Sequence, residues 1–170
     1  DGVIKKTSLD QQQTFMLNAN RVGMKVNGCF ILGLPGETEQ SAKETIKYSI
    51  KLSPNTAQFY PHMLYPGTKS FEWAEKEGLI EHKNWSDWLT TEGFHNTPIK
   101  INGLNSTKLL TLCDEARMRF YTHPKYLFKM VFQALGSKKE AQRIFIAGKS
   151  FFPLLAEYIW KKWTKPQNRP

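Results

Sequence analysis

The most informative part of this 170-residue chain is the stretch Gly28-Cys29-Phe30-Ile31-Leu32-Gly33-Leu34-Pro35-Gly36-Glu37-Thr38. Val26–Leu34 is short, apolar and rich in β-formers, which predicts a strand buried on both faces. Pro35 and Gly36 turn the chain, and Thr38 can cap a helix that runs through Leu52. The inner face of that helix repeats apolar residues at i, i+4 and i+8, namely Ala42, Ile46 and Ile50.

The segments around this stretch predict alternating helices and strands. Ser8 and Gln11 form a capping-box pattern before a helix whose apolar face we expect at Phe15, Leu17, Ala19 and Val22. Residues 57–64 predict a second strand, in which Pro61 indicates an edge or a bulge because proline cannot donate to the ladder. Helix, strand, helix and strand in short units indicate a parallel sheet with helices outside it. The sequence thus predicts an α/β region over 1–103 and a helical region over 104–170.

The charge of the chain is concentrated in its last third. The net charge is +9, and residues 114–170 hold 12 Lys and Arg against four Asp and Glu. Bulky aromatic residues accompany these lysines, a combination that suits a helix at an anionic membrane surface. An ordinary solvated face, with the aromatic residues packed inside, is the interpretation we favour from the sequence. Nucleic acid is disfavoured as a partner, because no binding motif is present.

The apolar runs, the cysteines and the histidines of the sequence limit the class of protein. No apolar run of 18 residues occurs, and Cys29 and Cys113 do not form a disulfide framework. We therefore expect a cytoplasmic protein, with peripheral membrane attachment as an option through the basic segment. The four histidines (His62, His82, His95 and His123) lack the spacing of metal ligands.

The end of the first strand is the candidate ligand site. Ligands of parallel sheets bind at the carboxyl ends of the strands. Gly33 has no Cβ and would let a flat ligand approach the backbone, while Glu37 could fix the loop by accepting backbone hydrogen bonds. A tight turn without a ligand explains the same residues equally well. A phosphate loop is excluded, because the Gly-Lys-Ser/Thr signature is missing.

Together with Tyr65-Pro66-Gly67-Thr68 after the second strand, this stretch carries a family resemblance. Residues 3–78 resemble the second half of the catalytic domain of radical S-adenosylmethionine enzymes, above all the group with a cobalamin-binding domain ahead of it. The resemblance implies a partial TIM-type (β/α)6 barrel with a [4Fe-4S] cluster, an oxidoreductase of iron–sulfur type. Such an enzyme reductively cleaves S-adenosylmethionine to a 5′-deoxyadenosyl radical, which acts on an organic substrate that the sequence does not identify.

The resemblance also assigns roles to single positions. It implies that Ile31 packs on the adenine, that Gly33 contacts it through the backbone, and that His62 or Met63 meets its edge. Cys29 stands where some relatives contact the ribose. The candidate cofactor-binding set is therefore Cys29, Ile31, Gly33, Glu37, His62 and Met63.

The sequence also departs from this family. The three cysteines that would hold the cluster are absent. We therefore expect a C-terminal fragment, inactive alone, whose partner is the missing N-terminal half of the barrel. Residues 104–170 would be a basic helical extension, and Trp85 and Trp88 would wall a substrate cavity. The alternative is a non-enzymatic, basic helical module that binds an anionic membrane surface.

Overall fold

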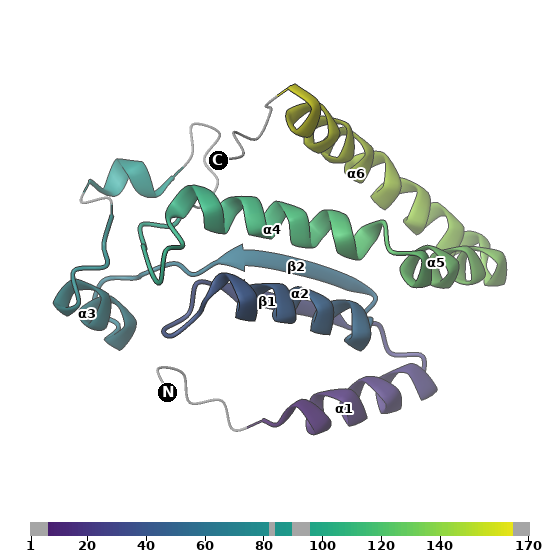
Figure 1. Cartoon of the computed structure of the whole chain (residues 1–170). Coiled ribbons are helices and arrows are strands. Elements are labelled where there is room, and N and C mark those ends of the chain that lie inside the picture. The colour runs from purple at the N-terminus through teal and green to yellow at the C-terminus, as the bar shows by residue number, and fades with distance from the viewer. Residues whose placement is uncertain (1–6, 82–83, 90–95, 165–170) are drawn as a thin grey trace. The chain divides into compact units, whose positions relative to one another are not determined.

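The computed structural model describes residues 7–81, 84–89 and 96–164 and divides the chain into two compact units. The first unit is Asp1–Phe120 and the second is Tyr121–Pro170. The elements of the first unit are α1 (Leu9–Arg21), β1 (Asn27–Leu32), α2 (Glu39–Leu52), β2 (Thr56–Pro61), α3 (Lys69–Lys76), a 3-10 helix (Trp85–Trp88) and α4 (Ser106–Tyr121), which ends at the boundary (Figure 1). The second unit contains α5 (Pro124–Gly136) and α6 (Lys138–Thr164).

Strands β1 and β2 form a two-stranded parallel sheet with α2 as the connection between them. The register runs from Asn27 opposite Thr56 to Leu32 opposite Pro61. The predicted cap of α2 is confirmed, because the Thr38 hydroxyl accepts from the Ser41 amide at 3.2 Å. Pro61 is the last residue of β2, where its missing N–H interrupts no further pairing within the strand.

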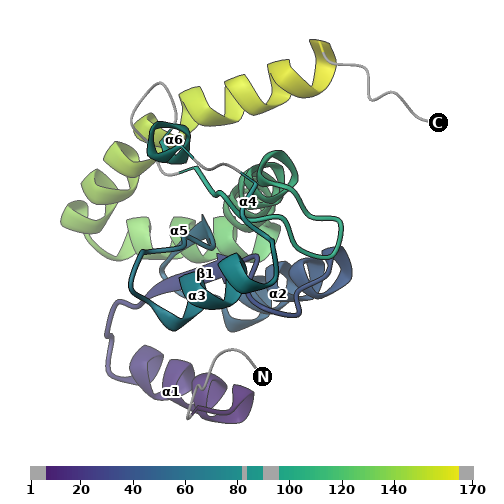
Figure 2. The same cartoon turned by 90° about the vertical axis from the view of Figure 1, so that its left-hand side faces the viewer.

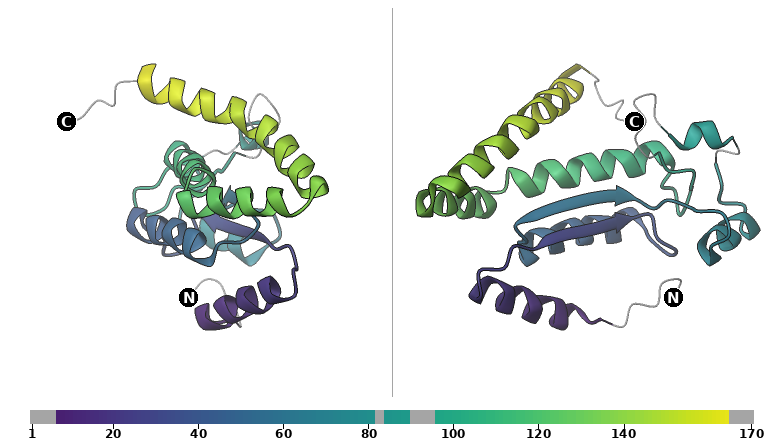
Figure 3. Two further views of the ribbon diagram at one scale, coloured as in Figure 1. Left: turned by 90° about the vertical axis from the view of Figure 1, so that its right-hand side faces the viewer. Right: turned by 180° about the vertical axis from the view of Figure 1, so that it is seen from behind.

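One face of the sheet is packed and the other is open. Phe30 stacks on Phe59 with ring centroids 5.2 Å apart, and Phe59 meets Phe120 of α4 edge-on. Helix α2 buries Ala42 and Ile46 and lies behind the strands in the rear view of Figure 3, so it covers one face only. Residues along β1 alternate between exposed and partly or fully buried. The prediction that this strand is buried on both faces is therefore wrong.

The face of α1 that packs also differs from the prediction. The helix begins with the predicted capping box, in which Ser8 and Gln11 exchange hydrogen bonds of 2.8 and 3.2 Å. Its buried residues are Met16 and Ala19, and Tyr48 of α2 donates to the Leu9 carbonyl at 3.3 Å. Phe15, Leu17 and Val22 are exposed. Neighbours on a helix face are three or four residues apart, so Phe15 and Leu17 could not share one face.

The second unit is a pair of packed helices, α5 and α6 (Figure 2). Proline at the first position starts α5, and the His123 side chain accepts from the Lys125 amide as its cap. Met130 is buried in the pair, and Tyr121 contacts both Tyr126 and Phe151 with ring centroids 5.1 and 5.2 Å away. None of the described helices is long and apolar enough to cross a membrane.

The predicted fragment of a (β/α)6 barrel is wrong. The described residues form six α-helices and one sheet of two strands, without an arc of barrel strands. A strand, a helix and a parallel strand occur both in closed barrels and in open α/β sheets. Only the further strands, with their tilt and stagger, distinguish the two architectures, so the order of elements in this sequence could not decide between them.

Candidate functional site

The loop after β1 is held by the Glu37 carboxylate. The amides of Gly33 and Leu34 both donate to its Oε2 atom, the second at 3.2 Å, and the Glu37 amide donates back to the Leu34 carbonyl at 2.9 Å. Burial raises the pKa of Glu37, and the two backbone hydrogen bonds partly oppose that rise. The prediction that Glu37 fixes this loop is confirmed.

Gly33 lies where α4 approaches the end of β1. Its φ of +92° falls in the left-handed region that favours glycine. A Cβ there would lie 3.0 and 3.2 Å from the two δ-methyl groups of Leu109. The absence of a side chain thus satisfies a packing requirement inside the protein. The expected approach of a ligand to Gly33 stays a prediction.

The end of β2 carries His62, which is fixed through both its backbone and its ring. Its amide donates to the Leu32 carbonyl at 2.6 Å, and its carbonyl accepts from the Thr97 hydroxyl at 2.7 Å. The ring Nε2 lies 2.7 Å from the Ser70 hydroxyl oxygen. Burial lowers the pKa of His62, which favours the neutral imidazole. Met63 follows, half-buried.

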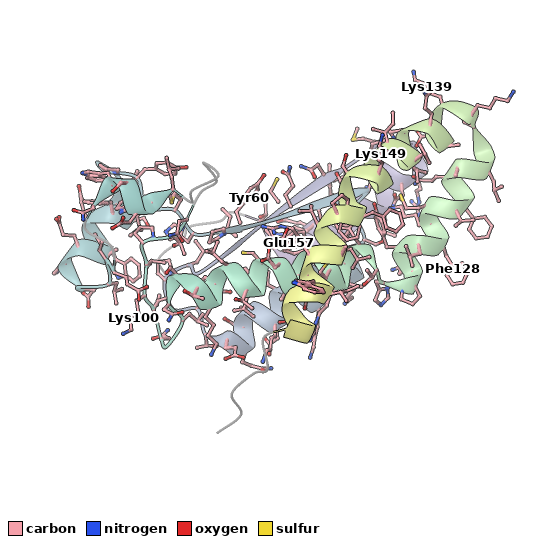
Figure 4. All side chains as sticks on the ribbon, turned by 90° about the horizontal axis from the view of Figure 1, so that it is seen from above. Tyr60, Lys100, Phe128, Lys139, Lys149 and Glu157 are labelled. Atoms are coloured by element: carbon pink, nitrogen blue, oxygen red, sulfur yellow. The ribbon has the colours of Figure 1, made fainter. Side chains whose placement is uncertain are left out.

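The face of the sheet that α2 and α4 leave uncovered, here called the open face, has a polar part and an apolar part. In the polar part, the Asn27 side chain donates to Gln58 at 3.1 Å, and the Cys29 thiol lies 3.5 Å from the same oxygen. In the apolar part, Ile31 and Tyr60 are cross-strand neighbours, 45% and 42% exposed. Tyr60 is labelled in Figure 4. The apolar pair is the nearer to the carboxyl ends of the strands.

The structure therefore divides the predicted set between two places. Gly33, Glu37 and His62 lie at the strand ends, whereas Cys29 and Ile31 lie on the open face. Sequence analysis missed three residues of this region, which are Tyr60, Ser70 and Thr97. The two-residue alternation of β2 places Tyr60 on the same face as Gln58 and could have identified it. Ser70 and Thr97 meet His62 only through tertiary packing, so no local signal marks them.

Trp85 and Trp88 belong to an aromatic cluster with Phe71 of α3. The two indole rings are 4.5 Å apart, and each lies within 6.3 Å of the Phe71 ring. Trp88 is buried and Trp85 is 58% exposed. Their contribution to a substrate cavity stays a prediction. Among the described residues, no three or more His, Cys, Asp or Glu side chains are grouped to hold a metal ion. His82 and His95 lie outside the described residues.

Comparison with known proteins gives one informative similarity. No family model matches this sequence. The chain is 32% identical over 135 residues to an uncharacterized methyltransferase of Pyrococcus horikoshii. The match covers 79% of this chain and 28% of that protein. This chain thus spans little more than a quarter of the length of the relative.

These findings correct the functional interpretation of the sequence. The prediction of a radical S-adenosylmethionine enzyme fragment of iron–sulfur oxidoreductase type is contradicted, because the relative is named a methyltransferase and no family model supports the resemblance. A [4Fe-4S] cluster and cobalamin find no support in either comparison. The stand-alone, non-enzymatic membrane module is not supported either, because the similarity is to a protein named as an enzyme.

Proposed function

We propose that this chain is part of a methyltransferase that uses S-adenosylmethionine as its methyl donor. The observation that carries the proposal is the 32% identity, over 79% of the chain, to the Pyrococcus protein named a methyltransferase. The fold supports it, because a strand, a helix and a parallel strand bring two strand ends to one edge, where α/β proteins bind nucleotide-like ligands.

The open face offers complementary surfaces for such a ligand. Ile31 and Tyr60 present an apolar and aromatic patch on which an adenine ring can stack. Cys29 and Gln58 lie two residues earlier on each strand, about 7 Å away along the sheet. At that distance their polar atoms can meet the ribose hydroxyls.

The strand-end loops would keep this surface in place. Glu37 holds Gly33 and Leu34, and His62 ties β2 to Ser70 and Thr97, so neither group needs to touch the ligand. Both act as positioning residues in this proposal, and Met63 continues the wall beyond His62. In the transfer, a nucleophilic atom of the substrate would bond to the methyl carbon while the bond from that carbon to the sulfonium sulfur breaks. S-adenosylhomocysteine would leave as the neutral thioether.

The test is the binding of S-adenosylmethionine to the chain, measured by isothermal titration calorimetry. We expect saturable binding that Tyr60→Ala weakens about tenfold, because stacking of one base on an aromatic ring contributes ~1–3 kcal/mol. Leu17→Asp is the matched control, since Leu17 is 60% exposed on α1 and away from both strands. Absence of saturable binding, or equal weakening by both variants, would contradict the proposal.

A further inference from the structure

Helix α5 is apolar on two opposite sides. One side, with Tyr126 and Met130, is partly or fully buried. The other side is the outer face, and its residues follow the spacing i, i+1, i+4, i+5 and i+8, which places them on one side of a helix. These residues are between 49% and 78% exposed and comprise Leu127, Phe128, Val131, Phe132 and Leu135. A helix with a second apolar side that is exposed presents a surface suited to a second apolar environment.

Helix α6 also carries exposed apolar residues. From residue 141 on, its partly buried residues recur at alternating steps of three and four, at 141, 144, 148, 151, 155 and 158. Outside that stripe, Phe145, Phe152 and Ile159 are seven residues apart, and Trp160 follows with 69% exposure. Seven residues are nearly two helical turns, so these side chains form a second row. The outer face of α5 and this row of α6 are together called the apolar rows of the hairpin.

Positive charge accompanies the apolar rows. Residues 121–164 contain eight Lys and Arg against two Glu, Glu140 and Glu157. The carboxylate of Glu140 pairs with Arg143 at 2.9 Å. Lys139 and Lys149 project from the same pair of helices as Phe128 (Figure 4). The segment therefore combines exposed bulky apolar side chains with a net charge of +6.

We propose that the α5–α6 hairpin docks on an anionic lipid surface, with its apolar rows in the boundary between headgroups and acyl chains. Lysines beside these rows would meet lipid phosphates, and Phe and Trp side chains suit the interfacial depth. The excess of positive charge selects an anionic membrane over a neutral one. This inference is independent of the methyltransferase proposal, because it uses no residue of the strand-end site.

The experiment is vesicle flotation of the 170-residue chain. The probes are vesicles of phosphatidylcholine alone and vesicles that contain an equal amount of phosphatidylglycerol. We expect the chain to float with the anionic vesicles, to remain behind with the neutral ones, and to release as ionic strength rises. Failure to float with anionic vesicles, or equal flotation with both, overturns the proposal.

Two variants and a matched control locate the surface. Phe128→Ser combined with Phe132→Ser should weaken binding at least about tenfold, because two aromatic groups that the membrane would bury are lost. Lys138→Glu combined with Lys139→Glu should weaken it at least about 25-fold, since each lysine contributes about fivefold near an anionic surface. Lys47→Glu combined with Lys51→Glu makes the same charge change on α2 and should have little effect. Equal loss in this control overturns the assignment to the hairpin, and circular dichroism verifies that each variant is folded.

Discussion

At the scale of single residues, His62 and Glu37 respond to burial in opposite directions. Burial lowers the pKa of His62 and raises that of Glu37. In each case burial disfavours the charged form, which is the cation for histidine and the anion for glutamate. Both residues lie at strand ends, so the stability of this region depends on pH.

The His62 contribution can be measured separately. Its pKa in the folded protein lies below the ordinary value of about 6.5, so the unfolded chain takes up the proton first as the pH falls. The free energy of unfolding should therefore decrease between about pH 7 and the pKa of the folded form. His62→Asn should remove this decrease, as urea unfolding at several pH values would reveal. The opposite contribution of Glu37 is present in both proteins and cancels in the comparison. Identical pH profiles would contradict this assignment.

At the scale of elements, local rules located the first two helices and both strands. The caps at Ser8 and Thr38 are confirmed, because capping requires only residues three apart in sequence. The first strand was expected at 26–34 and is Asn27–Leu32, since Gly33 leaves the β region. The second was expected at 57–64 and ends at Pro61. What each face contacts could not be predicted, because those partners are distant in sequence.

The contact between Gly33 and Leu109 is such a long-range partner, and it can be tested. Gly33→Ala must adopt a positive φ and also displace a Leu109 methyl group 3.0 Å away. Gly36→Ala is the matched control, with a φ of +82° and open space around its Cβ. We expect Gly36→Ala to cost ~1 kcal/mol of unfolding free energy and Gly33→Ala a further ~1–3 kcal/mol from overpacking. Urea denaturation measures both, and equal costs would exclude a packing role for Gly33.

At the scale of the whole molecule, the sequence patterns could not predict which elements pack against one another. Hydrophobic periodicity identifies the buried side of a single helix, but it does not say which other element covers that side. Helix α4 is an example. Its sequence continues into a basic segment, and that pattern does not indicate that its Phe120 packs on Phe59 of β2. The barrel prediction failed for the same reason, because a strand–helix–strand order fits more than one architecture.

The division into two units makes a last prediction about cooperativity. Phe59 is fully buried in the first unit and Met130 is buried in the second. Met130→Ala removes apolar contacts worth ~2–4 kcal/mol, and we expect it to increase amide hydrogen exchange in α5 and α6 while β1 and β2 keep their protection. Phe59→Ala should show the reverse pattern, with exchange increased in β1, β2 and α4. Hydrogen exchange followed by mass spectrometry resolves these segments. Equal loss of protection in β1 and β2 in both variants would show that the two units unfold as one cooperative body.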